Sequence, residues 1–219
     1  MGLIESKGNM YTWTTHQWNP IGGDCIHDCK YCYVNRWGKK PPLNFKEKYL
    51  KDNLETGRRI FVVSGGDMFA ENVPSDWIFK TLEHCNRFDN EYLYQSKNPY
   101  RFMEFIEYFP VRSIFCTTIE TNRIYQEMGN TPSPKNRSDG MWLLDDYKRY
   151  VTIEPIMDFD LDELVNLIRL CHPEQISIGA DSGNKNLPEP SKEKLLELIY
   201  ELKKFTVIDQ KRNLKRLLL

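Results

Sequence analysis

Three of the chain's six cysteines, Cys25, Cys29 and Cys32, lie within the short segment GGDCIHDCKYCYV. Their C-x3-C-x2-C spacing supplies three thiolates, whereas a closed structural zinc site needs four protein ligands. A [4Fe–4S] cluster bound by three cysteines instead leaves one iron open, and an open coordination position can bind a small molecule. The pattern therefore favours an iron–sulfur cluster with an open iron. Zinc, with His27 or His16 as the fourth ligand, is the alternative.

The composition of the 219-residue chain is that of an ordinary globular protein, with 40% hydrophobic and 28% charged residues. A formal net charge of -1 gives no overall attraction to nucleic acid or to anionic lipid. No apolar run is long enough to span a bilayer, and the N-terminus lacks the hydrophobic segment of a signal peptide. We therefore expect a cytoplasmic protein without membrane contact, whose cysteines stay reduced.

Short β-rich runs alternate with helical patterns along the chain, which is typical of an α/β protein with parallel strands and right-handed crossovers. Helices are expected after Pro74-Ser75, after Asp160, which forms an acidic capping box with Glu163, and after Ser191. Six strands are too few to close an eight-stranded barrel, so we expect one domain, 1–219, forming an open or partial (β/α)6 TIM-like barrel. Residues 203–219 are expected to form a basic, apolar tail. The six predicted strands are Met10–Trp18, Arg59–Gly66, Tyr92–Lys97, Ser113–Glu120, Tyr150–Ile156 and Gln175–Asp181.

The cysteine segment follows the first predicted strand, and its sequence CIHDCKYC resembles the signature of the radical S-adenosylmethionine (SAM) superfamily. Ser64-Gly65-Gly66-Asp67, at the end of the second strand, is similar to that superfamily's GGE motif, with aspartate replacing glutamate. The chain also resembles an uncharacterised, phage-associated branch of the superfamily, and more faintly the spore photoproduct lyases, which repair DNA. The likeness to the branch rests on WNPIGGDC, QSKNP, TTIETNR, SPKNR, IEPIMDFD and GADSG, which are spread over most of the chain.

The resemblance implies a radical SAM fold and the chemistry of that superfamily. Cys25, Cys29 and Cys32 would bind the cluster, and the open iron would chelate SAM. An electron from a donor such as flavodoxin or ferredoxin would then cleave SAM to a 5′-deoxyadenosyl radical, which abstracts hydrogen from a substrate.

The resemblance also assigns SAM contacts. Tyr31 would lie near the adenine, and the turn Ser64–Asp67 would bind the methionine part, with backbone carbonyls receiving its amine because aspartate is short. Glu120, with Thr118 second, would contact the ribose. Arg123 would grip the carboxylate, unless it only caps the following helix.

Alternation within Ser113–Glu120 predicts that Cys116, Thr118 and Glu120 share the interior face of the sheet, opposite Phe115 and Ile119. An interior thiol at Cys116 can return a hydrogen atom to a substrate radical, or can simply pack as a small apolar group. Charged residues also lie within or at the end of other predicted strands, and they predict either a polar cavity or a supporting lysine–carboxylate network. These residues are Lys97, Glu154 and Asp181.

The remaining cysteines, Cys85, Cys116 and Cys171, are too scattered for a second cluster. The loop Asn130–Gly140 is rich in proline, glycine and polar residues and is expected to form a mobile lid. Lys135 and Arg137 within it can contact phosphate, which suits a nucleotide or nucleic-acid substrate. The alternative function is a non-catalytic iron–sulfur or zinc protein that docks on a partner through its tail.

Overall fold

The computed structural model describes residues 2–8 and 10–219, and its centre is an eight-stranded sheet in the order β1-β2-β5-β6-β7-β8-β9-β10. β1 is antiparallel to β2, and every other neighbouring pair in this sheet is parallel. The strands are β1 (Leu3–Glu5), β2 (His16–Trp18), β5 (Arg59–Val62), β6 (Glu91–Gln95), β7 (Ser113–Thr118), β8 (Lys148–Ile153), β9 (Gln175–Ile178) and β10 (Val207–Gln210). A separate antiparallel pair joins β3 (Ile21–Gly22) to β4 (Asn44–Phe45).

The α/β class and the parallel arrangement of the six predicted strands are confirmed, although two of the expected boundaries need correction. Only the last three residues of Met10–Trp18 are in a strand, because residues 10–15 turn across the sheet instead. The expected tail 203–219 contributes β10, which pairs with β9, and a buried Leu214. The sheet is therefore longer than the six strands that we expected.

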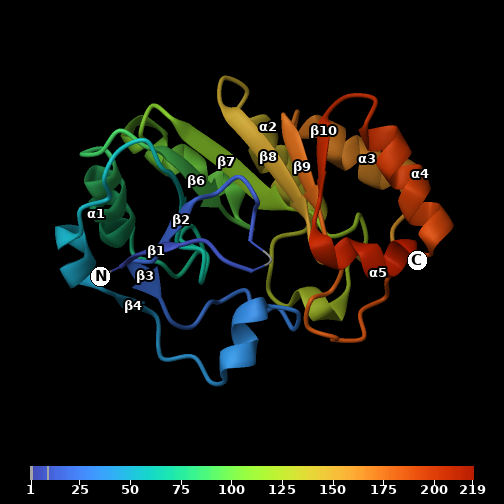
Figure 1. Cartoon of the computed structure of the whole chain (residues 1–219), viewed down its shortest axis with the longest axis horizontal. Helices are drawn as coiled ribbons and strands as arrows, with labels where there is room; N and C mark the ends of the chain where they lie inside the picture. Colours follow the sequence, from blue (N-terminus) through green and yellow to red (C-terminus); the bar gives the residue numbers. More distant parts are fainter. Residues whose placement is uncertain (1, 9) are drawn as a thin grey trace.

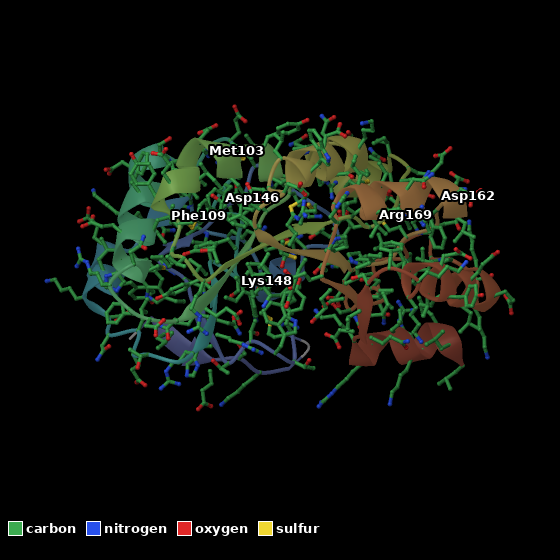
Figure 2. All side chains as sticks on the ribbon, turned by 90° about the horizontal axis from the view of Figure 1, so that it is seen from above. Met103, Phe109, Asp146, Lys148, Asp162 and Arg169 are labelled. Atoms are coloured by element: carbon green, nitrogen blue, oxygen red, sulfur yellow. The ribbon has the colours of Figure 1, made fainter. Side chains whose placement is uncertain are left out.

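Helices cover one face of the sheet, as Figure 1 shows with α1 at one end, α4 at the other and α2 and α3 behind the strands. In Figure 2, Met103 of η3 and Arg169 of α3 lie in this same helical layer. Neighbouring helices in the layer contact one another in the order η3, α2, α3 and α4. The α-helices are α1 (Ser75–Cys85), α2 (Pro134–Trp142), α3 (Leu161–Leu170), α4 (Lys192–Leu202) and α5 (Lys215–Leu218). The 3-10 helices are η1 (Tyr33–Trp37), η2 (Glu47–Lys51), η3 (Pro99–Tyr108), η4 (Gln126–Met128) and η5 (Arg212–Leu214).

The helix starts agree only in part with the sequence expectations. Ser191 caps α4 as predicted, since its hydroxyl accepts the Lys194 N–H at 3.3 Å. Asp160 precedes α3, but it makes no side-chain cap because its carboxylate binds Arg123 instead. The capping box predicted for that helix is therefore wrong.

The segment expected to be a lid, 130–140, forms most of helix α2 instead. Ser133 caps the helix by accepting the Asn136 N–H at 3.1 Å, and Pro134 occupies the first turn, where its missing N–H costs nothing. Lys135 pairs with Asp139 one turn away, at 2.6 Å. The prediction of a mobile lid is wrong, because serine and proline at the start of a helix resemble the composition of a loop.

Successive side chains of β7 point to opposite faces of the sheet, as the alternation predicts, and they pack in two different buried clusters. Phe115 packs among the aromatic rings of the helical layer, with Phe102 and Phe109 at centroid distances of 5.0 and 4.7 Å. Cys116 faces the other side, in a small cluster with Tyr11 from the turn that precedes β2. Because this turn covers only part of the inner face, the carboxyl ends of the strands remain accessible. No helix in the described ranges is long and apolar enough to cross a membrane.

Candidate functional site

A cavity of about 320 Å³ opens at the carboxyl ends of the parallel strands. Its wall combines the cysteine segment, the turn after β5 and the ends of β6 to β9. In Figure 1, η1, which directly follows Cys32, lies in blue at the lower edge, below the sheet. Most of the candidate residues line the cavity, namely Cys25, Cys29, Cys32, Tyr31, Ser64, Gly65, Gly66, Asp67 and Thr118, whereas Glu120, Cys116 and Arg123 do not.

The cysteine segment is held in a tight conformation by a distant part of the chain. The backbone N–H of Asn130 donates to the His27 carbonyl at 2.7 Å, and the Asn130 side chain donates to the Ile26 carbonyl at 3.1 Å. Gly129 has φ +65°, and a Cβ there would clash with the His27 carbonyl oxygen. Only glycine allows this close approach. The segment 126–130 is therefore a clamp on the cysteine loop, and no sequence signal pointed to it.

Two thiols of the segment, Cys25 and Cys29, sit in an environment that disfavours free thiolates. Burial raises the pKa of the Cys25 thiol to about 12, and the nearby Asp67 carboxylate adds to this. Burial also raises the pKa of Cys29, against the opposing effect of the Lys97 ammonium group. Both thiols are therefore protonated at neutral pH in the metal-free protein, and ligation of a metal would displace their protons.

The donor set fits an iron–sulfur cluster better than a single metal ion. Within residues 2–8 and 10–219, no three His, Cys, Asp or Glu side chains are arranged to hold one ion. His27 Nε2 bonds to Asp67 Oδ2 at 2.8 Å, and the ring of His16 lies against Thr15 and Arg58. The zinc alternative thus lacks its fourth ligand. A cluster accepts wider thiol spacing, because each sulfur binds a different iron.

The turn after β5 presents bare backbone to the cavity. Gly65 and Gly66 both line the wall, and a Cβ at either position would meet its nearest protein atom at 3.6 or 3.8 Å. Side chains would therefore fit the protein but would project into unfilled space. Asn19 fixes the turn by accepting the Gly65 N–H at 3.0 Å. Such a wall suits a ligand that approaches the backbone closely.

Asp67 ties this turn to the cysteine segment. Its buried carboxylate accepts hydrogen bonds from His27 at 2.8 Å, from the Lys97 N–H at 2.8 Å and from the Phe69 N–H at 2.9 Å. Burial alone would raise the pKa of Asp67, but the hydrogen bond and charge of His27 outweigh it and lower the pKa. The aspartate is thus an ionised anchor whose acceptor sites are occupied by the protein.

Glu120 lies at the centre of a buried ionic network beneath the cavity. Its carboxylate accepts the Tyr31 hydroxyl at 2.5 Å and Arg137 Nη1 at 2.6 Å, and it also contacts Lys97. Burial would raise its pKa, but the positive charges of Arg137 and Lys97 lower the pKa to about 2. The Lys97 ammonium group lies 4.6 Å above the Tyr31 ring. The network supports the tyrosine that faces the cavity.

Arg137 completes this network, so its predicted contact with phosphate is wrong. Its side chain is 0% exposed. Besides Glu120, it donates to the carbonyls of Thr118 and Pro132, both at 2.7 Å, and to the Thr131 hydroxyl at 2.9 Å. A fully bonded, inaccessible guanidinium is a structural cation.

The inner face of the sheet adds a polar wall to the cavity. Gln95 donates to Thr118 at 3.0 Å and accepts the Tyr11 hydroxyl at 2.7 Å. Cys116 is 1% exposed and lies behind this wall, its sulfur 3.7 Å from the Thr152 hydroxyl. Burial raises the pKa of Cys116 to about 12. The sequence did not predict that Tyr11 belongs to this wall, because the residues around Tyr11 have the composition of a strand.

The opposite end of the cavity carries a second charged group. Lys211 donates to Glu154 at 2.5 Å, and Asn213 bonds the same carboxylate at 2.8 Å. Asp181, 5% exposed, accepts the Gly183 N–H at 2.8 Å. These contacts agree with the lysine–carboxylate network expected for Glu154, although its lysine comes from the supposed tail.

Arg123 lies outside this site. Its guanidinium donates to Asp160 at 2.5 and 2.9 Å and also contacts Asp158. Hydrogen bonding to Asp160 raises the pKa of Arg123 further above its ordinary value. The side chain therefore lies beside the start of α3, which is not the helix that follows Arg123 in the sequence and which Arg123 does not cap.

Comparisons with known proteins give a fold relationship. No protein-family model and no curated protein sequence matches this chain. Among solved structures, it is similar to spore photoproduct lyase complexed with dinucleoside spore photoproduct, with a TM-score of 0.59 and 14% identity. The match covers 90% of this chain and 64% of that chain. A cysteine-to-alanine mutant of spore photoproduct lyase with the same ligand gives a TM-score of 0.57 at 12% identity, covering 90% of this chain and 63% of the mutant chain. The fold of this chain is thus similar to that of spore photoproduct lyase, the relative whose faint likeness the sequence suggested.

Proposed function

We propose that this protein is a radical SAM enzyme. Cys25, Cys29 and Cys32 hold a [4Fe–4S] cluster at the mouth of the cavity, and SAM occupies the adjoining space. When bound, cluster and SAM together supply a 5′-deoxyadenosyl radical that abstracts hydrogen from the substrate. One observation carries the proposal: three thiols, with no fourth ligand among the described residues, and a wall of bare glycine backbone line the same cavity.

In this proposal, the residues of the chain bind and orient SAM and do not themselves take part in the reaction. The carbonyl groups of Gly65 and Gly66 accept the SAM amine, because Asp67 is already occupied by His27 and Lys97. Tyr31 presents its ring to the adenine, and Thr118 offers its hydroxyl to the ribose. Glu120 acts through Tyr31, whose hydroxyl it fixes, rather than by direct contact.

The barrel type, the cellular location, the branch of the superfamily and the electron donor are proposals that go beyond the fold similarity. Strands β5 to β10 follow one another in sequence order across the sheet, which supports the partial barrel of the radical SAM type. A cytoplasmic location and the phage-associated branch are proposed on the sequence features given above. Flavodoxin or ferredoxin is the proposed source of the electron.

A nucleotide or nucleic acid is the proposed substrate class. The fold relative, spore photoproduct lyase, holds a dinucleoside photoproduct, and the present chain offers the exposed, cavity-lining cation Lys7. Phosphate groups favour such cations. Cys116 is the proposed hydrogen donor to the substrate radical, although its position behind Thr152 equally suits a packing role.

Anaerobic reconstitution with iron, sulfide and dithionite tests the class. The reconstituted protein is expected to bind SAM and to form 5′-deoxyadenosine, and a Cys29→Ala variant is expected to lose the cluster absorbance. The alternative, a non-catalytic iron–sulfur protein, predicts a full cluster with no SAM binding by equilibrium dialysis. That result would rule out the radical SAM assignment.

A further inference from the structure

The segment after the cluster cysteines is strongly basic in an otherwise balanced chain. From Cys29 to Lys46, both included, there are five basic residues and no acidic residue, whereas the whole chain has a net charge of -1. Arg36, Trp37, Lys39 and Lys40 form the part that we call the Trp37 patch.

An exposed aromatic residue is the centre of the patch. Trp37 is 64% exposed, and the Arg36 guanidinium lies 4.7 Å from the centroid of its ring. Tyr33 packs against the same ring edge-on at 5.6 Å, and the Tyr33 hydroxyl donates to the Ser64 carbonyl at 2.5 Å. The tryptophan is thus presented rigidly on the surface. Tryptophan and arginine are among the residues most enriched at the energetic centres of protein interfaces.

The patch adjoins the proposed cluster ligand Cys32 and extends from the rim of the cavity to the surface outside it. The Lys40 ammonium group lies 4.0 Å from the Cys32 sulfur, and Cys32 is partly exposed. Arg36 and Lys40 line the cavity, whereas Trp37 and Lys39 lie outside it. A partner that contacts Trp37 and Lys39 therefore comes close to the cluster without having to enter the cavity.

We propose that the Trp37 patch is the docking surface for an acidic one-electron donor protein of the flavodoxin class. The inference rests on the proposed function, because only a cluster that must be reduced needs such a partner. One electron would leave the reduced donor and enter the cluster held by Cys25, Cys29 and Cys32. No proton or group moves with the electron. Positive charge on this side attracts an acidic donor and speeds the encounter. Short distance then favours transfer, because tunnelling falls steeply with separation.

Direct binding gives a test that does not depend on catalysis. The reconstituted protein is titrated with oxidised flavodoxin, and the dissociation constant is compared with that of a Trp37→Ala/Lys39→Glu variant. Both residues are exposed, so folding is not at risk. Loss of an aromatic anchor and reversal of a rim charge should weaken binding by about tenfold or more, and added salt should weaken the wild-type complex.

A matched control is available on α4. Tyr200 is 65% exposed and carries the Lys204 ammonium group 4.6 Å from its ring centroid, so it reproduces the aromatic–cation pair far from the cluster. The variant Tyr200→Ala/Lys203→Glu has the same change of charge and a similar loss of aromatic area. Its affinity for flavodoxin should stay within about twofold of the wild type. Equal losses in the two variants would overturn the proposal.

Changing the reductant tests the docking proposal separately from the proposed radical SAM function. With dithionite, the Trp37 variant should form 5′-deoxyadenosine at the wild-type rate, whereas with reduced flavodoxin its rate should fall about tenfold. Absence of product from wild-type protein with dithionite would refute the radical SAM function itself. If the variant instead loses binding of a single-stranded oligonucleotide and keeps its affinity for flavodoxin, the patch is a nucleic-acid surface and the docking proposal is wrong.

Discussion

Replacing Arg137 by methionine removes the main counter-charge of Glu120 while keeping most of the side-chain volume. The carboxylate then remains buried with Lys97 and the Tyr31 hydroxyl as its partners. The hydrogen bonds that Arg137 donates to Thr118, Thr131 and Pro132 disappear at the same time. Removing one partner of a buried ion pair costs about 3–5 kcal/mol of unfolding free energy, because the remaining charge is left uncompensated.

The lowered pKa of Glu120 gives the contribution of the same network to the free energy of unfolding by a second route. A carboxyl group whose pKa falls from 4.5 to about 2 on folding contributes about 3 kcal/mol at neutral pH. Because the folded-state pKa is the lower one, this stability is fully present above about pH 4.5. It is lost as the pH falls toward 2. The Glu120→Gln variant should therefore be less stable at about pH 7 and should lose less stability than the wild type between about pH 5 and about pH 3.

Urea unfolding of the metal-free protein under reducing conditions measures these effects in a double-mutant cycle. In the Glu120→Gln background, the cost of Arg137→Met should fall by about 2 kcal/mol or more, since no buried carboxylate remains to be neutralised. Lys135→Met is the control on the same helix. It breaks an exposed pair with Asp139 and should cost about 0.5 kcal/mol or less. Equal costs of Arg137→Met in the two backgrounds would show that no such coupling exists.

Three further predictions address the cavity wall. Gly66→Val should leave cluster absorbance intact but lower SAM affinity by about 100-fold or more, because its side chain projects into the cavity; unchanged affinity by equilibrium dialysis would place SAM elsewhere. Asp67→Ala should reduce iron bound per chain, since His27 and the cysteine segment lose their anchor, whereas normal iron content after desalting would contradict this. Cys116→Ala should cost about 1 kcal/mol of stability and leave 5′-deoxyadenosine formation unchanged, because a hydrogen donor acts only after hydrogen abstraction; normal yield of substrate-derived product would refute its role as hydrogen donor.

The sequence predicted the local features of the site but not its long-range pairs. The facing of Phe115 and Cys116 follows from strand periodicity and is confirmed, and the three cysteines and the glycine turn after β5, which the family resemblance singled out, line one cavity. Short-range patterns of this kind are fixed by backbone geometry, so they can be read from one chain.

The remaining features depend on partners that are distant in sequence. The polar neighbours of Arg137 predict a lid, yet Glu120 buries this side chain through a pairing that no local pattern encodes. Strand β10 is four residues long and lies in a charged segment, so its place beside β9 comes from the sheet rather than from propensity. Tyr11 likewise owes its position to Gln95, 84 residues away.

The clamp on the cysteine loop sets an order of events in maturation. Ile26 and Asn130 are 104 residues apart, so the loop cannot adopt its final conformation until β7 and the segment after it have emerged and folded. An earlier stage of synthesis presents the three thiols on an unsupported peptide. The three thiols are therefore brought into their final arrangement only after this half of the chain has folded, and the proposed cluster would find its complete site no earlier than that.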